Sequence, residues 1–301
     1  MTTTTGRPRT RRRFWTPGRA IRGLVLAGFG VYCAVPLVWL MLAPTKSDAE
    51  LVNDAPLSFG SFANIGRAWD NLAQYSDGVI YDWLLNSTLY TLASVAITVT
   101  TSLLAGYALA TTRVPGRQLV LVLTLVAMIV PPTALVLPMF LEINALNLTN
   151  TAWSVILPAS FYPFAVYLSF IYFSTSMPKE LMEAARLDGC SELGLFTRIA
   201  LPLAKPLVGL VAFFAFVASW TNYLLPYVML SQEDKYNLPV GLAAIVSGTP
   251  ALNPSQGGSF LPIHRPEAAL AGIVAVLPIA IVFLFAQRYL VRGILAGSVK
   301  S

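Results

Sequence analysis

Long apolar runs separated by short polar segments dominate this chain. Six of the runs approach the roughly 20 residues that an α-helix needs to cross a hydrocarbon core about 30 Å thick. They are Gly23–Ala43, Leu84–Ala110, Leu119–Leu141, Ala152–Phe173, Leu207–Leu230 and Ala268–Val291. The pattern predicts an all-α polytopic membrane protein with about six transmembrane helices, in a single transmembrane domain over residues 23–292.

Basic residues are distributed unevenly between the loops. Only Lys46, Arg67, Lys235 and Arg265 fall in the segments 44–83 and 231–266, and the other 16 of the 20 Lys and Arg residues fall elsewhere. Because basic residues are retained on the cytoplasmic side, 44–83 and 231–266 are predicted to be outer loops. The basic tail 1–22, the polar segment 176–205 and the C-terminal tail 293–301 are predicted to be cytoplasmic. The net charge of +6 comes from basic residues that are dispersed over several loops. This distribution predicts contact with membrane lipid and not with nucleic acid.

The apolar runs contain almost no ionisable side chains, since Glu142 and Glu267 lie at their edges. Ion-coupled transporters bury such groups as relays, and membrane enzymes need paired catalytic groups. Two cysteines, Cys33 and Cys190, and the one histidine, His264, have no recognisable metal or disulfide spacing. We therefore expect a protein that is not an enzyme, that has no cofactor of its own and that draws any transport energy from a partner.

Three of the runs carry features that a plain apolar helix does not need. Pro131, Pro132 and Pro138 lie so close together that the third run cannot be an uninterrupted helix. The second run has a series of hydroxyl side chains beside Ala105 and Gly106, which predicts close helix packing and bonds back to carbonyl groups. The hydroxyl residues are Thr88, Thr91, Ser94, Thr98, Thr100, Thr101 and Ser102.

The fifth run contains an amide, hydroxyl groups and aromatic rings in one stretch that is predicted to be helical. It comprises Ser219, Trp220, Thr221, Asn222 and Tyr223. Such groups suit contact with a neutral, hydroxylated solute such as a sugar. An aromatic belt near the outer interface explains them equally well.

The polar segment 176–205 predicts a helix, a glycine turn and a second helix. Pro178 precedes a helical stretch 179–187, Gly189 suits the left-handed position after a helix, and Ser191 can cap the next helix. Leu193, Phe196, Ile199 and Ala200 recur there at helical spacing, and Leu201-Pro202 ends it. The hairpin either lies on lipid as an amphipathic element or contacts another protein.

The order of residues in this hairpin resembles the coupling motif of ATP-binding-cassette importer permeases, in the carbohydrate (maltose-type) branch. The motif residues are Glu183, Ala184, Ala185, Gly189, Ile199, Leu201 and Pro202, with Asp188 beside the glycine. The resemblance extends over residues 84–230 and 268–301, through Asn86-Ser87, Ala105–Ala110, Pro115–Arg117, Ile129–Pro132, Ala204–Leu207 and Gln287–Gly293. The chain is similar to the shorter of the two permease partners in maltose importers.

The resemblance implies a permease subunit that forms half of a sugar pathway and docks its hairpin, between spans 4 and 5, on a cytosolic ATPase. The implied partners are a second homologous permease, an ATPase dimer that binds ATP and Mg, and an extracytoplasmic solute-binding protein, all at a bacterial or archaeal plasma membrane. A tail contact with the ATPase is implied for Gly297, Ser298, Val299 and Lys300. A contact loop for the binding protein is implied for Asn253, Pro254, Ser255, Gln256, Gly257 and Gly258.

Two positions depart from the family pattern. Cys190 replaces a residue that is more often Ala, which is a small-for-small change. Asn222 follows Thr221 instead of following Trp220 directly, which on a helix turns the amide by about 100°. The alternatives that remain are an ion-coupled secondary transporter, a membrane scaffold that docks a non-ATPase protein and, among importers, a glycerol-phosphate or polyol substrate.

Overall fold

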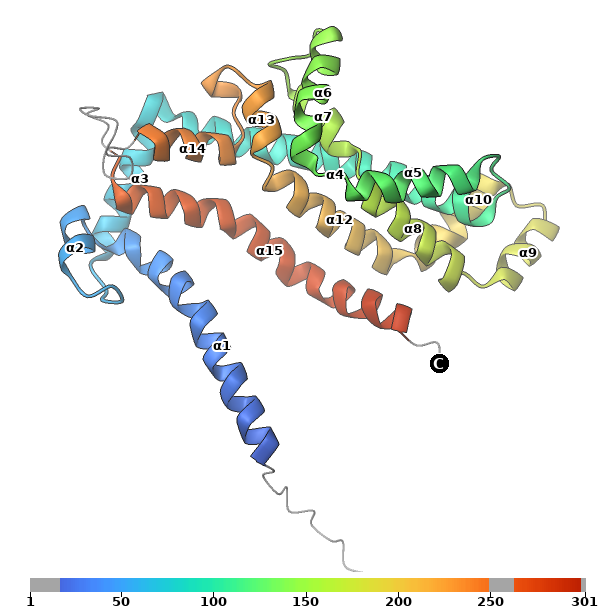
Figure 1. The fold of residues 1–301 in the computed structure, drawn as a ribbon, viewed down its shortest axis with the longest axis horizontal. Coiled ribbons are helices and arrows are strands. Elements are labelled where there is room, and N and C mark those ends of the chain that lie inside the picture. Colours follow the sequence, from blue (N-terminus) through green and yellow to red (C-terminus); the bar gives the residue numbers. More distant parts are fainter. Residues whose placement is uncertain (1–16, 249–262, 299–301) are drawn as a thin grey trace, which may run out of the picture.

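The structure, a computed structural model, describes residues 17–248 and 263–298, and every element in this part is helical (Figure 1). The helices before the hairpin are α1 (Pro17–Leu42), η1 (Ala43–Thr45), α2 (Asp48–Asn53), α3 (Phe62–Gln74), η2 (Tyr75–Gly78), α4 (Val79–Thr111), α5 (Arg117–Ile129), α6 (Pro132–Ala145), α7 (Ala152–Ser160) and α8 (Pro163–Ser176). The hairpin and the rest are α9 (Lys179–Leu187), α10 (Glu192–Leu195), η3 (Phe196–Ala200), α11 (Leu201–Leu203), α12 (Lys205–Trp220), α13 (Leu224–Met229), η4 (Glu233–Lys235), α14 (Leu238–Gly248) and α15 (Arg265–Ser298).

By length and composition, four helical stretches of the described residues can cross a membrane, or up to six if each of two bent pairs counts as one span. This agrees with the predicted number. The first bent pair is α5 and α6, which meet at 109° next to Pro131 and Pro132, so the predicted interruption of the third run is confirmed. The second pair is the hairpin's second arm and α12, which meet at 81°.

The prediction of one continuous helix over the fifth run is wrong. Helix α12 ends at Trp220, and helical structure resumes only at Leu224. Asn222 therefore lies in the break, and the expected 100° rotation around a helix does not apply to it. The last turn of α12 is closed by hydrogen bonds from the Thr221 amide to the Val217 carbonyl at 3.1 Å and from the Asn222 amide to the Ser219 carbonyl at 3.2 Å.

Helix α4 is the centre of the bundle and packs against α7, α8, α12 and α14. Gly106 allows α8 to approach closely, since a Cβ atom there would lie 2.4 Å from the Cβ atom of Ser169. On the buried side, the Thr98 hydroxyl donates to the Ser160 carbonyl at 3.0 Å, where α7 ends. On exposed sides Thr100 and Thr101 bond back to the carbonyl groups four residues earlier. Both roles predicted for the hydroxyl series are confirmed.

The two ends of the bundle differ (Figure 1). The hairpin helices α9 and α10 lie at one end, and α2, α3 and α14 lie at the other. At this second end Asp48 forms a salt bridge with Arg265 at 3.1 Å, and Asn71 donates to Glu267 at 2.8 Å. These bonds join the predicted outer loop 44–83, which is largely helical, to the start of α15. Helix α1 diverges from the bundle, and its apolar side chains are exposed.

Candidate functional site

The turn of the hairpin has the geometry of a Schellman motif. The Cys190 amide donates to the Ala185 carbonyl and the Gly189 amide donates to the Arg186 carbonyl, both at 3.0 Å. Gly189 has a φ of +80°, in the left-handed region that only glycine enters without strain. The predicted helix and the predicted role of Gly189 as its terminator are confirmed.

The second arm of the hairpin is tied to the first arm and to α4. Ser191 caps it by accepting a hydrogen bond from the Gly194 amide at 3.2 Å, as predicted. The Arg186 guanidinium donates to the two carboxylate oxygens of Glu192 at 2.8 and 3.3 Å, and the Tyr107 hydroxyl donates to Glu192 at 3.4 Å. Because Glu192 bonds both to the first arm and to α4, the hairpin cannot rotate freely against the bundle.

Apolar packing anchors the hairpin more strongly than its polar contacts do. Leu195 and Phe196 are buried in one cluster with Met182 of the first arm and Phe173 of α8. The Tyr107 ring lies 5.2 Å from the Phe196 ring and 5.6 Å from the Phe173 ring, between centroids. Burial of such side chains contributes about 1.5–3 kcal/mol each. A displacement of the hairpin must therefore move the ends of α4 and α8 with it.

The apolar residues that recur at helical spacing in the second arm do not all lie on one buried face. Phe196 and Ala200 are buried, but Leu193 is 67% exposed and Leu195 is fully buried. Ile199 and Leu201, from the resemblance motif, are half-buried against the same cluster.

The tip of the hairpin presents an apolar surface away from the bundle. Leu187 and Leu193 are 88% and 67% exposed, and Leu181 is 43% exposed. Four of the motif residues, Glu183, Ala184, Asp188 and Gly189, are exposed on the first arm and its turn, and so is Pro202 near the end of the second arm. Exposed leucines beside small side chains are typical of a surface that another protein covers.

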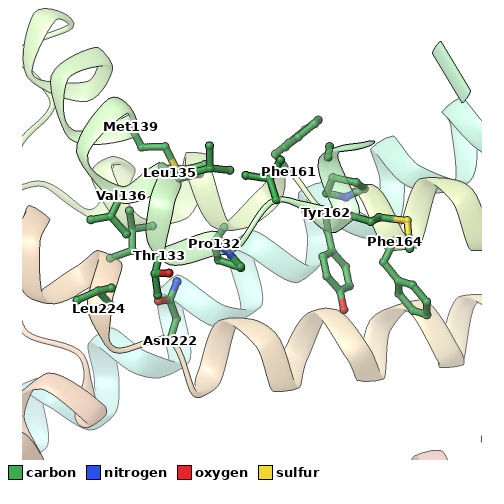
Figure 2. A pocket seen from close by; sticks show the side chains of 17 residues that line it. Pro132, Thr133, Leu135, Val136, Met139, Phe161, Tyr162, Phe164, Asn222 and Leu224 are labelled. Atoms are coloured by element: carbon green, nitrogen blue, oxygen red, sulfur yellow. The ribbon is translucent and has the colours of Figure 1, made fainter. Parts of the chain in front are cut away.

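A second feature lies between the two ends of the bundle, where three helix breaks meet. The break between α5 and α6, the break between α7 and α8 and the break between α12 and α13 all border one cavity of about 520 Å³. Seventeen residues line it, and none of them is charged. Figure 2 shows the Asn222 amide and the Thr133 hydroxyl pointing toward one another on one side of it, with Tyr162 further along.

Of the five polar and aromatic residues predicted in the fifth run, only Asn222 lines this cavity. Trp220 is buried, donates from Nε1 to the Ala275 carbonyl at 2.9 Å and stacks on Phe216. The Ser219 hydroxyl is buried 3.5 Å from the Thr91 hydroxyl. Thr221 is exposed and bonds back to a carbonyl group, and Tyr223 stacks on a neighbouring tyrosine.

Several predicted contact residues are not placed by the structure. The loop residues Asn253, Pro254, Ser255, Gln256, Gly257 and Gly258 and the tail residues Val299 and Lys300 lie outside the described residues. Gly297 and Ser298 belong to the last turn of α15. Within the part of the chain that is described, no group of three or more His, Cys, Asp or Glu residues could hold a metal ion.

Comparison with known proteins identifies the family. Residues 99–296, which include the hairpin and all three breaks, match the family described as binding-protein-dependent transport system inner membrane component. The chain belongs to this family. It is therefore the membrane component of a transport system.

Several relatives are named for the substrates of their transport systems. The arabinooligosaccharides transport system permease protein AraQ of Halalkalibacterium halodurans is 38% identical over 88% of this chain and 90% of its own length. The sulfoquinovosyl glycerol transport system permease protein SmoH of Agrobacterium fabrum is 31% identical over 94% of each chain. The maltodextrin transport system permease protein MdxG of Bacillus subtilis is 31% identical over 89% of this chain and 92% of its own length.

The fold of this family member is also found in a solved structure. A chain of a bacterial ABC transporter involved in the import of the acidic polysaccharide alginate matches with a TM-score of 0.77. The match covers 92% of this chain and 99% of that chain at 21% identity, so the two share a fold.

Sequence reasoning missed some residues of both features. Tyr107 and Glu192 join the hairpin to α4, but they are 85 residues apart in the sequence. Thr133 and Tyr162 reach the cavity only because their helices break beside them. The proline residues next to these breaks were the available signal, and for Thr133 the Pro131-Pro132 pair pointed to the right place.

Proposed function

We propose that this chain is the permease subunit of an ATP-binding-cassette sugar importer, and that its hairpin docks on a cytosolic ATPase. The observation that carries the proposal is the hairpin itself, with an exposed leucine tip and a base packed into the ends of α4 and α8. A partner that moves the tip thereby moves α8, whose opposite end borders the cavity at Pro163 and Phe164. Closure of the ATPase on ATP would then switch the permease between its inward- and outward-facing states.

The proposed pathway for the solute passes the cavity at the three helix breaks. Helix ends inside a membrane leave backbone groups that must find polar partners, so such breaks occur where protein or a water-filled cavity surrounds them. Asn222, Thr133 and Tyr162 supply hydrogen-bonding groups to a wall that is otherwise apolar. A second, homologous permease would supply the opposite wall.

The proposed substrate is a neutral oligosaccharide or sugar derivative. No charged residue lines the cavity, whereas a phosphate or sulfonate group in a low-dielectric site needs a cationic partner. Relatives named for arabinooligosaccharides and maltodextrin support a sugar, and a glycerol-phosphate substrate has no support from them. An acidic sugar would require a cation from the second permease.

The proposed setting is the plasma membrane of a bacterium or archaeon, with both termini and the hairpin in the cytoplasm. The distribution of basic residues supports this orientation. The remaining partners are an extracytoplasmic solute-binding protein and an ATPase dimer that binds ATP and Mg. The segment 253–258 and the tail residues 297–300 are proposed contacts for the binding protein and the ATPase, respectively.

The assembly is tested by affinity purification of this chain from mildly solubilised native membranes. The bound proteins are then identified by mass. We expect a second polytopic membrane protein and an ATPase. Reconstituted into liposomes, the purified complex should take up a neutral oligosaccharide with ATP present and should be insensitive to an uncoupler. Uptake that follows a proton gradient without ATP would establish a secondary transporter instead.

The role of the cavity is tested by Asn222→Leu. Loss of one hydrogen bond to a neutral group should raise the sugar concentration at which uptake is half-maximal by about 2- to 12-fold. Thr221→Val is the matched control, because Thr221 neighbours Asn222 but bonds only to a carbonyl group of its own helix. Equal effects of the two substitutions would remove Asn222 from the pathway.

A further inference from the structure

The segment 233–236, which follows α13, is fixed to α4 over four consecutive residues. The backbone carbonyl group of each of these residues accepts a hydrogen bond from a side chain of α4. The donors are Trp83 to Glu233 at 2.8 Å, Asn86 to Asp234 and Tyr236 at 2.7 and 3.1 Å, and Tyr90 to Lys235 at 3.1 Å. Segment 233–236 is therefore a strap that does not move independently of α4.

Asn237 follows the strap directly, and its side chain forms hydrogen bonds in two directions. The residue is buried, with 3% of its surface exposed. Its Oδ1 atom accepts from the Val240 amide at 3.4 Å and so caps the start of α14. Its Nδ2 atom donates to the Asn222 carbonyl at 2.7 Å. Asn237 thereby connects the start of α14 to the break between α12 and α13.

The Asn222 carbonyl needs this bond because its own helix offers no donor. In a continuous helix, the amide of residue 226 would donate to the carbonyl of residue 222. Residue 226 is Pro226, which has no N–H group. A carbonyl group without a partner is costly inside a membrane protein. Asn237 supplies the donor that the proline removes.

The start of α14 is itself attached to α4, which gives this bond a rigid origin. The Leu238 amide donates to the Ser87 hydroxyl at 2.6 Å. One turn along α14, Gly241 lies so close to the Trp83 ring that a Cβ atom there would lie 2.1 Å from it. The break can therefore leave its position relative to α4 only if the bond from Asn237 is lost.

We propose that Asn237 is a positioning residue, which holds the break after α12 so that the Asn222 side chain points into the cavity. The position of the Asn222 carbonyl fixes the local backbone, and the backbone fixes the direction of the side chain. Figure 2 shows the result, with the Asn222 amide directed toward the Thr133 hydroxyl. Asn237 is not among the residues that line the cavity, so it acts through Asn222 and does not contact the solute. The role in transport rests on the proposed function.

Asn237→Ser tests the proposal, because serine keeps the cap of α14 and removes the donor to the break. Serine caps a helix about as well as asparagine does, but its hydroxyl is one bond shorter and does not reach the Asn222 carbonyl. Asn237→Asp is the second variant, since a carboxylate caps α14 but cannot donate. The matched control is Ser87→Ala, which removes one buried hydrogen bond at the same helix start but none to the break.

Hydrogen–deuterium exchange measures the break directly, on the full-length chain in nanodiscs with the subunits that accompany it. We expect the amides of α13 to exchange about 5- to 30-fold faster in Asn237→Ser, because the break has lost one hydrogen bond. In Ser87→Ala the faster exchange should be at the start of α14, and exchange in α13 should be unchanged. Unchanged exchange of α13 in Asn237→Ser would overturn the proposal, and so would an equal increase there in Ser87→Ala.

Sugar uptake by the reconstituted complex measures the consequence for Asn222. Asn237→Ser should raise the sugar concentration at which uptake is half-maximal by about 2- to 12-fold, with the maximal rate unchanged. In a chain that also carries Asn222→Leu, it should raise that concentration no further. A purely structural role of Asn237 would instead give effects that add, and this result would overturn the proposal.

The two measurements separate this proposal from the proposed function. If the unchanged complex takes up no sugar with ATP, or if Asn222→Leu has no effect, the proposed function fails. The exchange measurement uses neither ATP nor sugar, so it still decides whether Asn237 holds the break. Failure of both Asn237 variants to fold would assign Asn237 to the stability of the fold and overturn the proposal.

Discussion

Replacement of Gly189 tests whether the geometry of the hairpin turn matters for docking. With a φ of +80°, alanine at this position carries a strain of about 1–2 kcal/mol. A Cβ atom there would meet nothing within 4 Å, so the backbone strain is the whole direct cost. Since the turn can relax when the hairpin is free and must re-form on docking, ATPase affinity should fall by about 5- to 30-fold.

The substitutions should form a graded series. Gly189→Asn should cost less than Gly189→Ala, because Asn enters the left-handed region more easily, and Gly189→Val should cost most. The control is Gly116→Ala, since Gly116 has a φ of +71° and a Cβ atom there also meets nothing within 4 Å. It carries the same strain outside the hairpin and should leave ATPase affinity unchanged.

The measurement is the dissociation constant between the purified permease complex and its ATPase, for example by interferometry on immobilised nanodiscs. Thermal unfolding of each variant shows whether the bundle is intact. Unchanged affinity in a folded Gly189→Ala variant would refute the reasoning. An equal loss in Gly116→Ala would also refute it, because the effect would then not come from the hairpin.

Four further substitutions test the fold. Gly106→Ala should destabilise the bundle by about 1–3 kcal/mol, seen as a lower Tm in detergent, because its Cβ atom would require α8 to move. Gly241→Ala should lower the Tm similarly, since its Cβ atom would lie 2.1 Å from the fully buried Trp83 ring, while Gly66→Ala, with nothing within 4 Å, should not lower it. Hydrogen bonds from the Ser47 backbone and side chain lower the pKa of Glu50, so the cap of α2 should be stable above about pH 4.5 and lost as the pH falls through that lowered pKa. Amide exchange in α2 should follow this pH dependence, and Glu50→Gln should remove it.

The sequence predicted the helices and the hairpin because each has a local cause. A run of apolar residues specifies a membrane helix whatever its neighbours are. Gly189 and Ser191 specify the turn and the next cap through bonds within a few residues. The Pro131-Pro132 pair interrupts its helix for an equally local reason.

The cavity could not be predicted in the same way. It exists because breaks in three helices meet at one place, and no local pattern records which breaks are neighbours. The end of α12 at Trp220 has no proline or glycine to mark it. The indole of Trp220 turns toward α15 instead of the pathway because its N–H finds the Ala275 carbonyl there, 55 residues away.

The most direct test of the coupling role is a photo-crosslinking residue at Leu187, which is 88% exposed at the tip of the hairpin. Ile129 is 80% exposed on α5 and is the matched position within the bundle. After illumination of native membranes and identification by mass, we expect Leu187 to capture an ATPase and Ile129 to capture none. Capture of only lipid or of a protein without ATPase activity at Leu187 would contradict the account.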